Sequence, residues 1–374
     1  MIRVNNIHLS LDYDDKSVRK AVAQQLRIEE KSIKSCKIFR RSVDARKKDN
    51  IYFLTTVDAE LNINEDKVCK KCGNAQIARK YEYNQMKFGN APSPIVVGAG
   101  PAGLFAALIL ARSGANPILI ERGRDVDRRT ADVNRFWTSG QLDTTSNVQF
   151  GEGGAGTFSD GKLNSGTKDI RQRKVLEEFV SHGAPDEILY NAKPHIGTDM
   201  LKGTIKNIRN EIIELGGRVM FETKLVSMAF SDNKLKSITV ETANGDEIIE
   251  TDNVILAIGH SARDTFEMLY DLKLPIEAKP FSVGARIEHL REKVDKAQYG
   301  RFAGNKKLGS ANYKLSTHLD NGRGVYTFCM CPGGKVVNAS SEENRLCTNG
   351  MSEFARNADN SNSALLVGIN PDDY

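Results

Sequence analysis

The stretch that most constrains the fold is residues 94–123, which read PIVVGAGPAGLFAALILARSGANPILIERG. A short apolar run at 95–97 precedes the pattern GxGxxG at 98–103. Apolar residues then recur at helical spacing, and a second apolar run, 117–120, ends in Glu121. This order of strand, glycine turn, helix, strand and acid predicts the dinucleotide-binding half of a Rossmann-like α/β fold.

Each part of this stretch has a physical role. Gly98 allows the tight turn, Gly100 lets the backbone approach a pyrophosphate, and Gly103 lets the helix pack closely on the strand. The free N–H groups at the start of the helix then face the phosphates. The carboxylate of Glu121 is placed to accept hydrogen bonds from ribose hydroxyls and would repel a 2′-phosphate, so the pattern disfavours NADP at this site.

Composition bounds the class of protein. The chain has 374 residues, of which 27% are charged and 40% hydrophobic, so we expect two or three globular domains. No apolar run approaches the roughly 20 residues of a membrane span, and the N-terminal residues MIRVNNIHLSLDYDD lack a signal-peptide apolar region. Six cysteines in so long a chain suit a reducing compartment, and we expect a cytoplasmic protein.

Residues 1–60 predict a small β-α-β-β unit with a ferredoxin-like arrangement. Residues 1–94 hold 19 Lys and Arg against 12 Asp and Glu, whereas the remaining 280 residues hold 34 against 36. The basic side chains at one hairpin are Arg40, Arg41, Arg46, Lys47 and Lys48. They could bind nucleic acid or an acidic partner, but a solvated hairpin tip is the favoured interpretation, and we expect no nucleic-acid partner.

Residues 61–93 are interpreted as a connector that contains a CxxC motif at Cys69 and Cys72. A zinc site would need a further pair of ligands at suitable spacing, and a redox dithiol is a second alternative. Two ordinary reduced thiols are favoured over both, so no metal site is predicted.

A second glycine-rich run, VQFGEGGAGTFSDGKL, occupies residues 148–163. Its glycines permit close backbone approach and expose N–H donors, while Thr157, Ser159 and Lys162 add polar groups. The alternative is a flexible surface loop. A large cofactor bound in an extended pose could use such a second loop.

The remaining pattern predicts the layout of the chain. A helix at 204–215 and several short strands lead to the apolar run 254–258, which is expected to return to the sheet. We expect a dinucleotide-binding domain over 94–270, with helices on both faces of a parallel sheet, and a β-rich inserted substrate-type domain over 271–374.

These motifs resemble a known group, the FAD-dependent flavoproteins of the two-dinucleotide-binding superfamily. Within it, the chain is similar to an uncharacterised bacterial family of FAD-dependent, or NAD(FAD)-utilising, dehydrogenases. The resemblance rests on GAGPAGLFAALILARSG, ILIERG, FGEGGAGTFSDGKL, the stretch at Gly216 and Gly217, LAIGHSARDTFEML and VYTFCMCPGGKVVNASSE, which lie within residues 94–342.

The resemblance implies FAD as the cofactor. By likeness, the pyrophosphate would be held by Gly98, Ala99, Gly100, Pro101, Ala102 and Gly103, and the adenosine ribose by Glu121 with Arg122 beside it. Backbone groups at Leu225 would hold the adenine, and Gly259 would lie where the chain crosses near the cofactor. The residues expected to approach the flavin are Gly154, Ala155, Gly156, Thr157 and Lys162.

The expected function is that of an FAD-dependent oxidoreductase that transfers a hydride or an electron pair to or from a small-molecule substrate, with NAD(P)H as a candidate reductant. His260, Arg263, Arg286, Cys329 and Cys331 lie in segments that could reach the flavin ring, but no catalytic side chain is assigned. The alternative is a non-catalytic FAD- or nucleotide-binding sensor or a nucleic-acid-associated module. Relatives continue beyond the position of Tyr374, so we expect the chain to be truncated, with the flavin domain incomplete on its C-terminal side.

Overall fold

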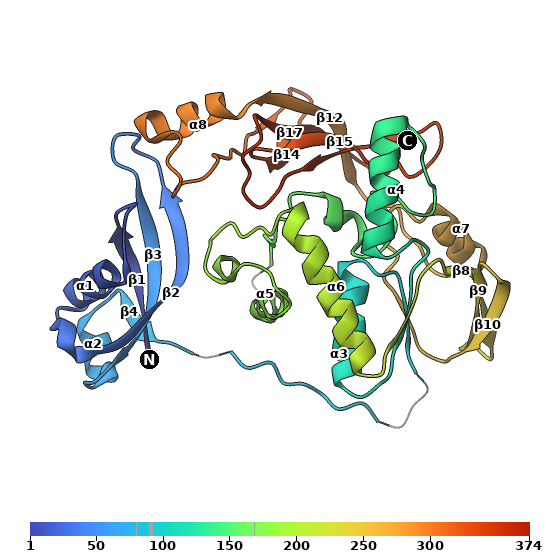
Figure 1. Cartoon of the computed structure of the whole chain (residues 1–374), viewed down its shortest axis with the longest axis horizontal. Helices are drawn as coiled ribbons and strands as arrows, with labels where there is room; N and C mark the ends of the chain where they lie inside the picture. Colours follow the sequence, from blue (N-terminus) through green and yellow to red (C-terminus); the bar gives the residue numbers. More distant parts are fainter. Residues whose placement is uncertain (80, 90–92, 168) are drawn as a thin grey trace.

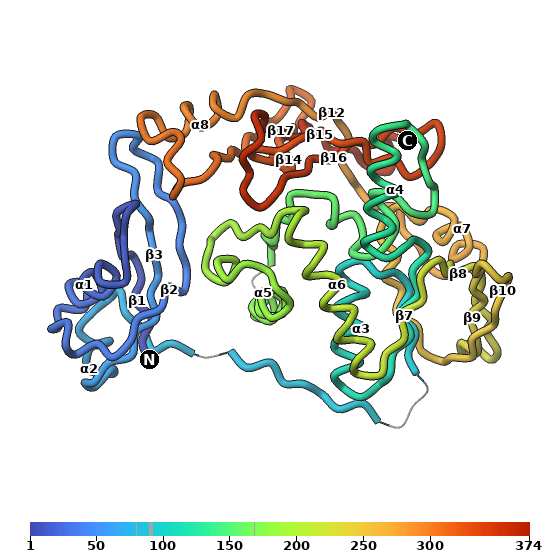
Figure 2. The backbone as a smooth tube through the Cα atoms, viewed as in Figure 1, coloured from blue at the N-terminus to red at the C-terminus, as the bar shows by residue number. Residues whose placement is uncertain are grey.

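The computed structural model describes residues 1–79, 81–89, 93–167 and 169–374. Figure 1 shows three sheet-containing parts, with the N-terminal sheet on one side and the dinucleotide-type sheet on the other. The C-terminal strands and α8 lie across the top between these two parts, and residues 81–89 run below them without helix or strand, as the tube in Figure 2 also shows. The chain therefore has a mixed α/β fold with several sheets, as the sequence predicted.

The N-terminal part is an antiparallel sheet in the order β2-β3-β1-β4. Its elements are β1 (Ile2–Leu9), α1 (Asp15–Leu26), β2 (Ile33–Asp44), β3 (Tyr52–Leu61), α2 (Glu65–Lys71) and β4 (Ala75–Ile77). Asp14 caps α1, because its carboxylate accepts a hydrogen bond of 2.7 Å from the N–H of Ser17. The sheet continues into the stretch interpreted as a connector, since β4 pairs with β1 at its edge.

The core of this N-terminal sheet is shared with a distant part of the chain. Val294, Tyr299, Leu308 and Met330 belong to the same buried apolar cluster as the residues of β1 and β3. A backbone contact ties the N-terminal sheet to another part of the chain, since the N–H of Arg41 donates to the carbonyl oxygen of Tyr190 at 2.7 Å. The N-terminal unit is thus docked by both apolar and polar contacts.

The dinucleotide-type sheet is parallel, with the order β11-β5-β6-β7. Its strands are β5 (Ile95–Val97), β6 (Ile118–Ile120), β7 (Arg218–Met220) and β11 (Val254–Leu256). The crossover from β5 to β6 is α3 (Pro101–Arg112), and α6 (Thr198–Glu214) precedes β7. The run expected at 254–258 does return to the sheet, beside β5.

The two faces of this sheet are covered differently. Val96 and Leu119 point into a cluster with α3, α5 (Arg171–Ser181) and α6. The opposite face is covered by α7 (Arg263–Asp271) and by the antiparallel strands β8 (Lys224–Ser231), β9 (Lys234–Thr242) and β10 (Gly245–Glu250). The prediction of helices on both faces therefore holds in part for this second face, where α7 shares the cover with a three-stranded sheet. Leu225 and Met228 of β8 and Ile238 and Val240 of β9 are buried in this cluster, so the strand pair supplies much of the apolar cover.

The C-terminal part is an antiparallel sheet in the order β12-β17-β14-β13, with a separate hairpin. Its elements are β12 (Phe281–Leu290), α8 (Arg291–Tyr299), β13 (Ser316–His318), β14 (Gly324–Cys331), β15 (Lys335–Asn338), β16 (Thr348–Met351) and β17 (Asn360–Ile369). Several large apolar side chains on this sheet are exposed, among them Phe281, Val283, Ile287, Phe328 and Leu365. Among the residues described, no helix combines the length and the apolar character needed to cross a membrane.

Candidate functional site

A cleft of about 680 Å³ opens at the carboxyl ends of β5, β6 and β11. The predicted residues that line it are Gly98, Gly100, Pro101, Ala102, Glu121, Arg122, Gly154, Ala155, Gly156, Leu225 and Gly259. The carboxyl edge of a parallel sheet is where ligands bind in open α/β folds, so the glycine turn, the acid and the second glycine loop converge where such a ligand would lie.

The three glycines of the turn have distinct surroundings. Gly98 has a φ of +100°, and a Cβ there would lie 2.5 Å from the carbonyl oxygen of Ala257. A Cβ on Gly103 would lie 1.8 Å from the carbonyl oxygen of Gly98, so only glycine lets α3 pack this closely. A Cβ on Gly100 would contact only the Cα of Gly154, at 3.9 Å. Gly100 therefore presents open backbone to the cleft.

Helix α3 begins at Pro101, directly against the cleft. Its N-cap is Gly100, and no side chain accepts a hydrogen bond from the first turn. Pro101 has no N–H to satisfy, and the following amides are free to bond to an external acceptor. The partial positive charge of the helix N-terminus thus faces the cleft.

Glu121 lies at the end of β6 and is 6% exposed. Its carboxylate accepts hydrogen bonds from the N–H groups of Ala99 at 2.8 Å, Gly123 at 2.9 Å and Gly151 at 3.0 Å. A carboxylate has about four acceptor directions, so one remains for a ligand hydroxyl. The residue ties the two glycine loops together, and its contact with a ribose stays a prediction.

Arg129, on α4 (Val126–Ser139), is a residue that the sequence analysis did not single out. Its guanidinium is completely buried and donates hydrogen bonds to the carbonyl oxygens of Asn147, Val148, Gly151, Glu152 and Gly154. Burial lowers the pKa of Arg129 to about 10. Because five carbonyl groups within 147–154 bond to this one guanidinium, the second glycine loop is held in a single conformation.

The other predicted residues lie outside the cleft lining. Ala99 and Gly103 are buried in the turn and helix. Thr157 is buried as well, and its hydroxyl donates to the carbonyl oxygen of Glu152 at 3.2 Å. The ammonium of Lys162 lies 2.7 Å from the carboxylate of Asp160, beside two thiols.

The five residues expected to reach a flavin ring divide into two groups. His260 lines the cleft, and Arg263 pairs with Glu342 near its rim. Cys329 and Cys331 instead lie beside Lys162 on the C-terminal sheet, and Arg286 donates to the carbonyl oxygen of Cys329. The structure therefore brings these last residues together in a cluster of their own.

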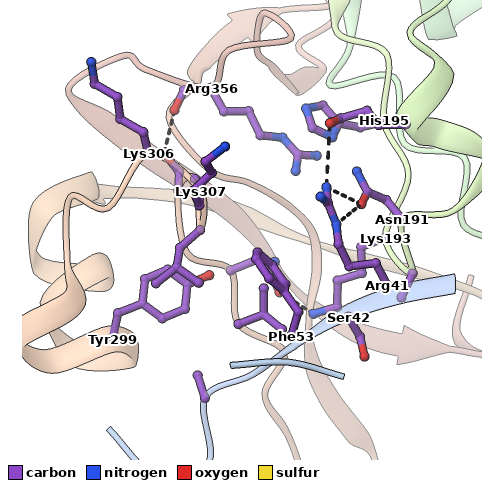
Figure 3. Close-up of a pocket in the computed structure, with 18 of the residues that line it drawn as sticks. Arg41, Ser42, Phe53, Asn191, Lys193, His195, Tyr299, Lys306, Lys307 and Arg356 are labelled. Atoms are coloured by element: carbon purple, nitrogen blue, oxygen red, sulfur yellow. Dashed lines mark hydrogen bonds and ion pairs between the residues drawn. The ribbon is translucent and has the colours of Figure 1, made fainter. Parts of the chain in front are cut away.

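A second cavity, of about 480 Å³, lies where the N-terminal sheet meets the C-terminal part (Figure 3). Its cationic or titratable basic side chains are Arg41, Lys193, His195, Lys306, Lys307 and Arg356. Arg41 is held by Asn191 and Tyr13, at 2.8 and 2.9 Å. Burial, and then the charge of Arg356, lower the pKa of His195.

This junction cavity could not be anticipated from sequence, because its residues come from distant segments. Arg41 belongs to the basic hairpin, yet it is half-buried in the junction. Arg46 agrees with the interpretation of this hairpin as a solvated tip, since its side chain is exposed and pairs with Asp44. Cys69 and Cys72 pack against the N-terminal core, and no group of three or more metal-ligating side chains occurs within the described ranges.

Comparison with family models gives three matches. Residues 93–133 match the model of an FAD binding domain, and residues 280–374 match that of an FAD-dependent protein, C-terminal domain-like. Residues 1–60 match a domain of unknown function. The cofactor of the cleft is FAD, since the first match covers the glycine turn and Glu121.

A curated relative from Clostridium beijerinckii, described as an uncharacterized protein, is 48% identical over 379 residues. The alignment covers all of this chain and 70% of the relative.

Solved structures with similar chains include the anhydrotetracycline hydroxylase OxyS of Streptomyces rimosus, at 14% identity and a TM-score of 0.36 over 74% of this chain and 45% of that one. Another is the glycerol-3-phosphate dehydrogenase of Bacillus halodurans complexed with FAD, at 13% identity and a TM-score of 0.36, over 75% of this chain and 47% of that one. The chain spans less than half the length of either.

Proposed function

The chain belongs to the same family as the Clostridium beijerinckii protein, and from this premise we propose that it is a flavin-dependent oxidoreductase of the dehydrogenase type. The observation that carries the proposal is the cleft in which the open backbone of Gly100, the start of α3 and the buried carboxylate of Glu121 converge. FAD supplies the chemistry of hydride or electron-pair transfer when it is bound.

The residues of the cleft fit such a cofactor. Glycines occupy the positions where the cofactor would pass closest to the backbone. The space beside Gly156 and Gly259 is open, since a Cβ on either would meet no atom within 4 Å. Gly98 to Gly103 would hold the pyrophosphate by backbone amides, and Glu121 would receive a ribose hydroxyl on its remaining acceptor direction. Arg122 would form a side wall, since its guanidinium lies over the ring of Phe150 at 4.5 Å.

The chain's own groups would orient the cofactor and keep its surroundings constant. Arg129 fixes the loop that carries Gly154, and Glu121 fixes that loop against the glycine turn. A small-molecule substrate and a nicotinamide reductant are the partners we propose, with no nucleic acid and no membrane.

The test is the visible absorption spectrum of the purified chain, followed by anaerobic addition of NADH and, separately, NADPH. We expect bound oxidised flavin that is bleached by one of the two, with Gly100→Val purified in parallel as the flavin-free control. Bound flavin that dithionite reduces but neither nucleotide does would support a non-catalytic FAD-binding module. Absence of flavin from the chain, even after incubation with excess FAD, would overturn the cofactor assignment.

A further inference from the structure

Two thiols and one ammonium group meet on the C-terminal sheet, and none of the three lines the dinucleotide cleft. Nζ of Lys162 lies 3.5 Å from Sγ of Cys331 and 4.0 Å from Sγ of Cys329. The S–H of Cys331 also donates to the carbonyl oxygen of Cys329 at 3.3 Å. The two cysteines therefore share one cation.

The backbone of β14 is irregular at this pair. Its register against β17 shifts between Phe328 and Cys331, and Cys329 has a φ of +48°. A β-bulge re-aims side chains, and a non-glycine residue in the left-handed region is costly. Both features are concentrated at functional sites, and here they coincide at one cysteine.

Lys162 is held in place from its other side. Its ammonium is 2.7 Å from Oδ2 of Asp160, which is 1% exposed. Asp160 in turn accepts hydrogen bonds from the hydroxyl of Ser352 and from Nε of Arg356, the latter at 2.8 Å. The ammonium is thus positioned against the thiols by a buried, ordered carboxylate.

The opposite side of the pair holds a second cation and a free donor. Nη1 of Arg286 donates to the carbonyl oxygen of Cys329 at 3.2 Å and to Oδ1 of Asn362 at 2.7 Å. Asn362 is completely buried, and its Nδ2 has no acceptor among the described residues. A Cβ on Gly350 would lie 2.6 Å from Sγ of Cys331, so a glycine is needed to make room for this thiol.

These surroundings shift the pKa values of the two thiols in opposite directions. A hydrogen bond between the two thiol side chains, and then the charges of Lys162 and Arg286, lower the pKa of Cys329 against the effects of burial and of the charge of Asp160. The hydrogen bond to Cys329, together with burial, raises the pKa of Cys331. Cys329 is therefore the more acidic thiol of the pair, and Cys331 is the thiol that keeps its proton.

We propose that Cys329 and Cys331 are a redox-active dithiol that exchanges with small-molecule disulfides, at a site that does not depend on the flavin. The thiolate of Cys329 attacks one sulfur of R–S–S–R, a mixed disulfide forms, and R–S⁻ leaves and takes a proton from water. Cys331 then loses its proton to water and attacks Sγ of Cys329, which releases the second thiol. Two electrons pass to the substrate disulfide, and the pair ends as an internal disulfide that excess thiol reverses.

The first test uses 5,5′-dithiobis(2-nitrobenzoate) on the full chain, followed by trypsin and mass spectrometry. Cleavage after Arg323 and Lys335 puts both cysteines in one peptide, while the exposed Cys347 falls in another and serves as an internal control. In the wild type we expect an internal disulfide, detected as the loss of two hydrogen atoms. In Cys331→Ser we expect a stable nitrothiobenzoate adduct on Cys329. A stable adduct on Cys329 in the wild type, or an unmodified pair when Cys347 has reacted, would overturn the proposal.

The second test follows the rate of alkylation by iodoacetamide between about pH 6 and 8. The rate at Cys329 should change less than about twofold, whereas a free small-molecule thiol of ordinary pKa should gain about tenfold per pH unit over most of that range. Lys162→Met should make the Cys329 profile steeper, and Lys162→Arg should keep it flat. Lys206→Met, which removes a lysine paired with Asp127 at the surface, is the matched control. A Lys162→Met profile identical to the wild type would show that the ammonium has no such role.

Discussion

The carboxylate of Glu121 accepts a hydrogen bond of 2.8 Å from the backbone N–H of Ala99, inside the glycine turn itself. The same carboxylate bonds to Gly123 and Gly151. The acid that the motif assigns to a ribose therefore also holds the protein's own backbone in position, and its replacement should affect stability as well as binding.

Glu121→Ala should lower the free energy of unfolding by roughly 3 kcal/mol, because three buried N–H donors lose their acceptor. FAD affinity should fall tenfold or more, which corresponds to about 1.4 kcal/mol. Denaturant unfolding and FAD titration measure the two effects separately. Glu121→Gln keeps one acceptor oxygen and should lie between wild type and Glu121→Ala in both. FAD binding by Glu121→Ala within twofold of wild type would contradict a ribose contact.

Gly100→Val should abolish FAD binding while the chain stays folded, since a Cβ at Gly100 meets no atom closer than 3.9 Å. Gly103→Ala should instead unfold or strongly destabilise the chain, because its Cβ would lie 1.8 Å from a carbonyl oxygen. Circular dichroism and flavin fluorescence distinguish the two outcomes. Gly203→Val, on the exposed side of α6, is the matched control and should retain both fold and flavin. Retention of flavin by Gly100→Val would refute the backbone contact.

Arg129→Met should cost more than about 4 kcal/mol of unfolding free energy, because it leaves five loop carbonyls without their donor. Arg128→Met, one residue earlier, removes a half-exposed arginine and should cost less than about 1 kcal/mol. Urea unfolding of the two variants gives the comparison. Equal losses would mean that Arg129 does not organise the loop.

His195 should make stability depend on pH below about 6.5. Its pKa in the folded chain is lowered by burial and by Arg356, so the unfolded chain binds more protons in that range. The free energy of unfolding should therefore fall as the pH drops from 6.5, and His195→Gln should show a weaker fall. Urea unfolding between about pH 5.5 and 8 tests this, with His318→Gln, an exposed residue on β13, as the control. A slope unchanged by His195→Gln would contradict the expectation.

Local patterns in the sequence were sufficient for the parts whose structure depends on near neighbours. The strand at 95–97, the turn at Gly98, helix α3 and strand β6 follow one another within about 25 residues, and each is specified by apolar spacing or by a glycine with no steric alternative. The antiparallel pairs formed by β8, β9 and β10 were also predictable, because each short strand carries apolar residues and the turn residues that join the strands are close in the sequence. Most of the predicted cofactor residues between Gly98 and Glu121 line one cleft for this reason.

Only the tertiary structure decided which strands, loops and side chains from distant segments pack against one another. The apolar residues and turn residues of β8 to β10 predict short strands, but not that these strands cover the second face of the parallel sheet. From the sequence alone, Arg129 would be placed among the exposed charged residues of a polar helix. Its burial follows from the path of the loop at 147–154, which wraps around its guanidinium. Lys162 and Cys331 are 169 residues apart, and their contact depends on how the C-terminal sheet docks beside the glycine loop. The physical reason is that helix and strand periodicity is a short-range property of the chain, whereas burial, ion pairing and thiol acidity depend on groups that only the completed fold brings within a few ångströms.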